Sequence, residues 1–324
     1  MPTKIEISHK TIFFTVFFLA FLWLLFQIKD IILLVFVAFI FMAALKPWVE
    51  RVEKLKIPRF LAILIVYSFL FFILAVTLIF VLPPLVTQTS NLGKYLPKYL
   101  EAALPFVNLH LQTLIDQFAP LGENLIRITI SFFSNIFTLV TIFIFTFYFL
   151  LERAHLREFL ISFVGKQAEK RLIEIFRKIE NRLGRWIRAQ ISLCLIVGVT
   201  SYIGLSILRV NFALPLAILA GMLEIIPTLG PIVSAIPAIL IAAFTSPLLG
   251  VAVIALYFII QQLENTLIVP QVMKKTIGLP PLVTFLALLI GGRIAGIAGA
   301  VLSIPTVLML EVIISSLSIT AKKE

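Results

Sequence analysis

The sequence has few of the residues with which soluble proteins cover their surfaces. Of its 324 residues, 13% are charged and 61% are hydrophobic, whereas globular proteins average about 25% charged residues. Apolar runs of roughly 20 residues, the length that crosses about 30 Å of hydrocarbon, recur along the whole chain. We therefore predict an all-α fold, a polytopic helical integral membrane protein.

Cysteine and histidine are scarce as well. The single cysteine, Cys194, lies in an apolar run and can form no internal disulfide. The three histidines, His9, His110 and His155, are far apart and lack the spacing of a metal site. No nucleophile has a neighbouring base and no Walker A pattern occurs. The sequence predicts no catalytic residue, no cofactor, no metal and no evident use of ATP, so we do not expect an enzyme.

Positive charge is plentiful, and its placement follows a membrane topology. The net charge is +11. Residues 46–59 carry five basic and two acidic side chains, and residues 152–188 carry ten basic and five acidic ones. Lys and Arg gather on cytoplasmic loops of membrane proteins. We therefore expect both stretches and both termini in the cytoplasm, with membrane lipids rather than nucleic acid as the partner of the basic residues.

Five segments follow from this pattern. Residues 1–82 form transmembrane helices 1–3, residues 83–128 an extracytoplasmic amphipathic helical insert, and residues 129–151 transmembrane helix 4. Residues 152–189 form a basic cytoplasmic helical segment, and residues 190–324 a C-terminal transport core with interrupted helices. The total is about 7–8 transmembrane helices plus re-entrant or broken helical hairpins.

The basic segment has an apolar stripe at helical spacing, formed by Leu172, Phe176, Ile179, Leu183 and Trp186. Such a helix can lie on anionic lipid or pack against a neighbouring subunit. An ordinary solvated connecting helix fits the same pattern.

A carboxylate stands beside a proline break at Glu224 to Pro231. Apolar runs 214–224 and 231–244 are each short for a span, so they form a re-entrant hairpin or two short spans. Pro227 lacks an N–H and is expected to free the Leu223 carbonyl. That carbonyl, the Glu224 carboxylate and a half-helix end together can bind a cation or a hydroxylated solute. The alternative is a glutamate at headgroup depth.

A second polar patch lies about 40 residues later. Gln261, Glu264 and Asn265 share one helix face, which suits either a hydroxyl-rich ligand or an interfacial position. The apolar block 282–318 is too long for one span and is interrupted near Gly291-Gly292-Arg293 and Pro305, which predicts a helical hairpin. Arg293 is a candidate counter-ion for either glutamate, an anion-contacting group or a residue that snorkels to a headgroup. The candidate substrate- or ion-binding residues are Glu224, Pro227, Gly230, Pro231, Gln261, Gln262, Glu264, Asn265, Pro270 and Arg293.

These motifs resemble those of the autoinducer-2 exporter-like (AI-2E) family of membrane transporters. The resemblance rests on Glu224-Ile-Ile-Pro227-Thr-Leu-Gly230-Pro231, Gln262-Leu-Glu264-Asn265, Pro270-Gln-Val-Met, Gly278-Leu-Pro-Pro281-Leu and Gly291-Gly292 through Gly296-Ile-Ala-Gly299-Ala to Pro305. The resemblance implies a multi-pass protein of a bacterial-type plasma (inner) membrane and a homo-oligomer, with a pentamer as one form. It also implies export of autoinducer-2 or a related small solute, or sodium/proton antiport.

We accordingly predict a secondary transporter, an exporter of a small polar solute of the autoinducer-2 type with a monovalent cation as the coupling ion. One alternative is a sodium/proton antiporter. Another is a non-transporting membrane scaffold or regulator that acts through its basic cytoplasmic helix.

Overall fold

The computed structural model describes residues 9–76, 79–80, 83, 87, 136–152, 166–227, 229–273 and 279–321. All regular structure in these residues is helical, which confirms the predicted all-α class. The predicted insert at 83–128 lies almost entirely outside the described residues. The helices are α1 (His9–Gln27), α2 (Lys29–Glu53), α5 (Ile136–Leu151), α7 (Lys166–Ile207), α8 (Ala213–Leu223), α9 (Leu229–Thr245), α10 (Pro247–Leu263), α11 (Val269–Met273) and α12 (Pro281–Ala321).

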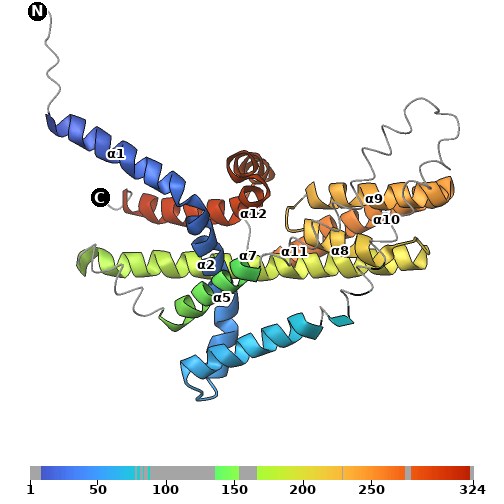
Figure 1. Cartoon of the computed structure of the whole chain (residues 1–324), viewed down its shortest axis with the longest axis horizontal. Helices are drawn as coiled ribbons and strands as arrows, with labels where there is room; N and C mark the ends of the chain where they lie inside the picture. Colours follow the sequence, from blue (N-terminus) through green and yellow to red (C-terminus); the bar gives the residue numbers. More distant parts are fainter. Residues whose placement is uncertain are drawn as a thin grey trace, which may run out of the picture.

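Helix α7 is the axis of the molecule (Figure 1). It contacts α2 and α12 along one half and α8, α10 and α11 along the other. Its 42 residues join part of the predicted basic segment and the start of the predicted transport core, residues 190–207, in one continuous helix. No proline interrupts this stretch of sequence, so the backbone hydrogen bonds of the helix can run through the basic-to-apolar boundary.

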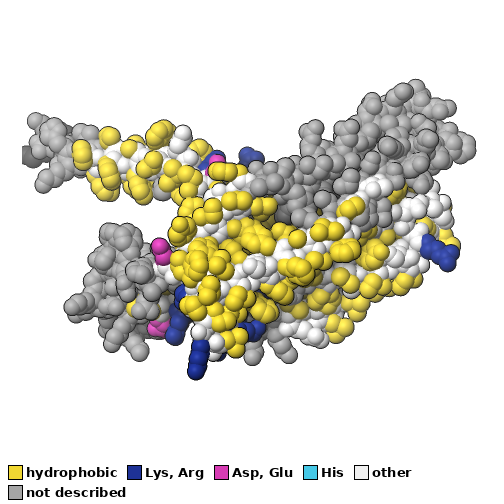
Figure 2. Space-filling model, turned by 60° about the horizontal axis from the view of Figure 1, so that its bottom comes forward, with side chains coloured by type: hydrophobic (Ala, Val, Ile, Leu, Met, Phe, Trp, Pro, Cys, Tyr) yellow, Lys and Arg dark blue, Asp and Glu magenta, His cyan; other side chains and the backbone are white. Residues whose placement is uncertain are grey.

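Within the described residues, five helices are long and apolar enough to cross a membrane. They are Lys29–Glu53, Arg59–Val76, Arg171–Ile207, Pro247–Val272 and Leu282–Ser316. Shorter apolar helices accompany them at Phe13–Leu24, Phe137–Leu151, Ala213–Leu223 and Leu229–Thr245. Apolar side chains cover much of the face shown in Figure 2, with Lys and Arg side chains mainly near its margins. Both findings agree with a polytopic membrane protein.

Three of the five residues of the apolar stripe of α7 are buried inside the chain, and the other two, Leu172 and Phe176, are half-buried. Ile179, Leu183 and Trp186 pack in one core with residues of α2 and α12. The stripe therefore meets neighbouring helices of the same chain, a use that the sequence pattern does not distinguish from contact with lipid or with another subunit.

Helix α2 continues beyond the apolar run that ends at Leu45. It passes through Pro47 and ends at Glu53, where the sequence pattern alone predicts a loop. Nearby, the helix Arg59–Val76 packs against α5: the Tyr67 hydroxyl donates to the Phe143 carbonyl at 2.9 Å, and Arg59 Nε donates to the Leu150 carbonyl at 2.7 Å. These contacts tie the N-terminal helices together.

The last helix, α12, is a pair of limbs. Ala295 and Gly296 have non-helical dihedral angles, and Gly296 has φ +59°, which favours glycine. The backbones of Gly291 and Gly299 approach so closely that a Cβ on either would collide with the carbonyl of the other. Figure 1 shows the two limbs in red at an angle to one another. The break lies slightly after the predicted position at residues 291–293.

Candidate functional site

Glu224 lies at the end of α8, and its side chain is only 1% exposed. Its own N–H closes the last helical turn on Ala220 O at 3.1 Å. The chain then turns, and α9 begins at Leu229. The Leu223 carbonyl, which was expected to be free, accepts a hydrogen bond from the N–H of Ile226 at 3.0 Å. The turn after the helix therefore satisfies the carbonyl that Pro227 was expected to free, and the Glu224 side chain remains the acidic group of this turn.

Gly230 and Pro231 shape the same turn. Both are buried at the start of α9. A Cβ at Gly230 would collide with the Leu223 carbonyl, so only glycine lets α9 fold back this closely onto the end of α8. This close approach gives Gly230 a structural role in the candidate site.

Glu264 lies where α10 widens into a short π-helix, η1 (Glu264–Ile268). The N–H of Val269 reaches back five residues to the Glu264 carbonyl. Pro270 follows and has no N–H to continue an α-helical ladder. A π-turn keeps the helix continuous where the sequence predicts an interruption, and such turns are frequent at functional sites.

The amides next to Glu264 form the expected patch. Gln261 Nε2 donates to Glu264 Oε2 at 3.3 Å and lies 3.5 Å from Asn265 Oδ1. Glu264 is 5% exposed, whereas Asn265 is exposed. In this patch the Glu264 carboxylate is therefore buried, and the Asn265 side chain is exposed.

The two glutamates meet. The carboxyl groups of Glu224 and Glu264 lie within hydrogen-bonding reach of one another, although about 40 residues separate them in the sequence. Glu224 Oε2 is buried and accepts no hydrogen bond from the described residues. Two carboxylates this close repel, and burial strengthens the repulsion because the local dielectric is low. A proton or a cation between them relieves it.

A third buried polar residue, Gln190 of α7, completes the site. Its Nε2 donates to the Glu224 carbonyl at 2.7 Å, and its Oε1 has no hydrogen-bond partner among the described residues. The side chain is 1% exposed. Sequence reasoning missed Gln190 because it stands at the boundary between the basic stretch and the following apolar run, where a polar residue is ordinary.

Small residues bring α8 against α7 at this level. Gly221 packs on Gly198, and a Cβ at Gly221 would lie 2.8 Å from the Cys194 carbonyl oxygen. Cys194 itself lies close enough to Glu224 to interact with it electrostatically. Such close backbone contact is typical of membrane helix pairs. It holds Glu224 next to α7, where Gln190 can reach its carbonyl.

Comparison with known proteins identifies the family of this chain. A profile described as AI-2E family transporter matches residues 12–319. The chain belongs to the AI-2E family of transporters. It is 28% identical to "Putative transport protein YrrI" of Bacillus subtilis over 90% of this chain and 87% of that protein. It is 27% identical to "AI-2 transport protein TqsA" of Escherichia coli over 88% of this chain and 84% of that protein.

In this AI-2E transporter three further predicted site residues, Gln262, Pro270 and Arg293, are exposed, whereas the two glutamates are buried. Gln262 and Pro270 are exposed on the helix that carries Glu264. Arg293 is exposed beside the break of α12, and no ion pair of the described residues joins it to either glutamate. The acidic residue of the same helix, Glu311, forms an ion pair with Arg182 of α7 at 2.7 Å rather than with Arg293. The structure therefore assembles Glu224, Glu264, Gln261 and Gln190 and leaves Arg293 outside.

Proposed function

We propose that this AI-2E transporter is a secondary exporter of a small polar solute of the autoinducer-2 type, coupled to a proton or another monovalent cation at Glu224 and Glu264. The contact between these two buried carboxyl groups is the observation that carries the proposal. Ionisable side chains in membrane-embedded segments are costly and commonly mark ion pathways. The printed name of the Escherichia coli relative supports the substrate class.

In this proposal, the charge on the glutamate pair controls the rearrangement that transport requires. With one proton or cation between them, the two carboxylates attract that ion and stay together. When it leaves, two like charges remain in a buried position and repel. The Glu224 turn and the Glu264 π-turn belong to separate elements that both pack on or beside α7, so repulsion between them favours a rearrangement of these elements. Binding of the ion would thereby be linked to a change in the side of the membrane from which the solute site is accessible.

Orientation is part of the proposal. The basic half of α7 and the polar end of α2 are placed in the cytoplasm of a plasma membrane, together with both termini. The excess of Lys and Arg over Asp and Glu in these stretches supports that placement.

Reconstitution tests the proposal. Proteoliposomes loaded with autoinducer-2 are given a pH gradient, and release of the solute is followed before and after an uncoupler collapses the gradient. We expect protein-dependent release that slows at least several-fold on collapse. Release equal to that of protein-free liposomes would reject the substrate class. Release that responds neither to the uncoupler nor to an imposed sodium gradient would reject ion coupling.

A further inference from the structure

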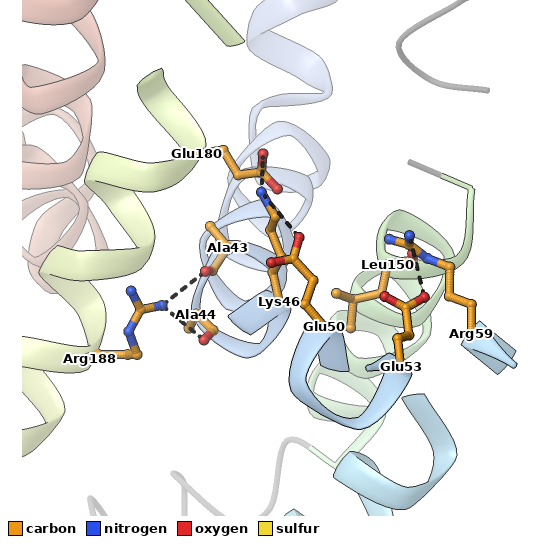
Figure 3. Close-up of polar contacts among 9 residues, drawn as sticks. All are labelled: Ala43, Ala44, Lys46, Glu50, Glu53, Arg59, Leu150, Glu180 and Arg188. Carbon is orange, nitrogen blue, oxygen red and sulfur yellow. Dashed lines mark hydrogen bonds and ion pairs between the residues drawn. The ribbon is translucent and has the colours of Figure 1, made fainter. Parts of the chain in front are cut away.

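Three arginines gather where α2 crosses α7, and we refer to Arg51, Arg185 and Arg188 as the arginine cluster. Arg188 Nη1 donates across the crossing to Ala43 O at 3.2 Å and to Ala44 O at 3.1 Å (Figure 3). Arg185 precedes Arg188 by three residues on α7, so the two share a face. Both Arg51 and Arg185 lie near enough to Arg188 to repel it.

The position of Arg188 follows from a proline in the facing helix. Pro47 lacks the N–H that would bond to the Ala43 carbonyl one turn earlier. Arg188 supplies the missing donor from α7. On α2, residues 44, 48 and 51 share one face, because they are spaced four and three residues apart. The Arg51 guanidinium lies over the Trp48 ring at 4.9 Å, which holds its charge on the face that receives Arg188.

The charge of the cluster is not neutralised within the described part of the chain. Neighbouring basic residues have carboxylate partners: Lys46 binds Glu180 at 3.1 Å, Lys178 binds Glu174 at 2.7 Å and Arg182 binds Glu311 at 2.7 Å. No ion pair of the described residues reaches Arg51, Arg185 or Arg188. Arg188, with Arg51 and Arg185 close enough to repel it and no carboxylate paired with any of the three in the described residues, forms a site for an anion.

The depth of the cluster matches the membrane surface. From Arg188 to the end of α7 at Ile207 the helix rises roughly 28 Å, close to the thickness of the hydrocarbon layer. Trp48 is 50% exposed, and Trp is enriched at the level of lipid headgroups. Phe60, just beyond α2, is also 50% exposed. At Arg51 and Trp48, charge and exposed apolar surface therefore lie side by side.

We propose that the arginine cluster binds the phosphate of an anionic phospholipid headgroup, with Trp48 against the lipid backbone. Guanidinium groups bind phosphate oxygens in a bidentate fork, and basic sites between membrane helices bind anionic headgroups. The apolar surface beside the cluster favours a lipid over a soluble phosphate, because it accepts the acyl chains. The site is separate from the glutamate pair and does not depend on the transported solute.

Fluorescence quenching tests the site. In a Trp23→Phe background, Trp48 is the exposed tryptophan, since Trp186 is 1% exposed. The protein is placed in bilayers that contain phosphatidylglycerol or phosphatidylcholine with brominated chains. We expect stronger quenching by the brominated phosphatidylglycerol, and a loss of this preference by roughly 30-fold in binding constant for Arg51→Gln/Arg185→Gln, which removes two charges at the surface.

The matched control is Arg177→Gln/Lys178→Gln, which removes two exposed charges from the same helix. It is expected to keep the preference for phosphatidylglycerol. Equal loss in the control, or no loss in the cluster variant, would overturn the proposal. Displacement of the brominated phosphatidylglycerol by millimolar inorganic phosphate would also overturn it, since the site would then take a soluble anion. If the double variant does not fold, Arg185→Gln alone serves, because Arg185 is exposed and donates only to Asn181 O within its own helix.

Discussion

At the scale of single residues, Gln190 links α7 to the Glu224 turn. Its amide donates to the Glu224 carbonyl at 2.7 Å, and both groups are buried. A buried carbonyl that loses a side-chain donor costs about 1–3 kcal/mol. The contact also fixes the backbone from which the Glu224 side chain projects, so it affects both stability and the geometry of the glutamate pair.

We therefore expect Gln190→Leu, which keeps the volume and removes the amide, to lower the free energy of unfolding by about 1–3 kcal/mol. A thiol-reactive dye can follow unfolding in detergent, because Cys194 is the only cysteine of the chain. Ser192→Ala is the control: Ser192 is exposed and donates only to Arg188 O in its own helix. An unfolding temperature of Gln190→Leu equal to that of Ser192→Ala would contradict the role assigned to Gln190.

The sequence indicates the two glutamates but not the residues and helix contacts that hold them in place. A carboxylate in apolar membrane sequence is rare enough to be noticed, whereas Gln190 at the end of a basic stretch is not. The contact of Glu224 with Glu264 depends on how α8 and α10 pack around α7, which no spacing in the sequence specifies. Arg293 had the right charge for a counter-ion, but it is exposed beside the break of α12.

At the scale of secondary-structure elements, the break in α12 depends on three glycines. Gly291 and Gly299 let the backbones touch, and Gly296 supplies the positive φ. The sequence predicted a hairpin here from length and from the run of glycines, and the structure shifts the break to Ala295 and Gly296. Near Glu264 a π-turn accommodates Pro270 without breaking the helix.

We expect Gly291→Ala to destabilise the protein by about 1–3 kcal/mol, because the new methyl group meets the backbone of Gly299, which cannot rotate away. Gly292→Ala is its neighbour and control: a Cβ there would lie 3.9 Å from Ala300 Cβ, an ordinary contact. The two variants are compared by thermal unfolding in the same detergent. Equal unfolding temperatures would show that the limbs do not pack as described.

At the scale of the whole molecule, the crossing of α2 and α7 joins the N-terminal helices to the half that carries the glutamates. Lys46 and Glu180 form a buried ion pair at 3.1 Å, with side chains 11% and 1% exposed (Figure 3). A Cβ at Gly184 would collide with the Ala43 carbonyl, so the helices also touch through their backbones. The sequence predicted basic stretches at residues 46–59 and 152–188, which include the end of α2 and the first half of α7. The crossing of the two helices and its buried ion pair follow only from the fold.

Breaking this pair from one side takes the lysine away from a buried carboxylate, which costs about 3–5 kcal/mol. We expect Lys46→Met to lower stability by about that amount, and Lys46→Met/Glu180→Met to recover much of the loss. Chemical unfolding of the three proteins in the same detergent measures both effects. A double variant less stable than Lys46→Met would show that the two charges do not depend on one another.

We propose that Glu224 and Glu264 act as one ion-coupling unit, and a double-mutant cycle on transport tests this most directly. Release of autoinducer-2 under a pH gradient is measured for wild type, Glu224→Gln, Glu264→Gln and the double variant, with the exposed Glu174→Gln as control. We predict that each single variant loses at least roughly tenfold in rate and that the double variant loses little more, because removing either carboxyl abolishes the pair. Losses that multiply in the double variant, or single variants that release the solute as fast as Glu174→Gln, would contradict the claim.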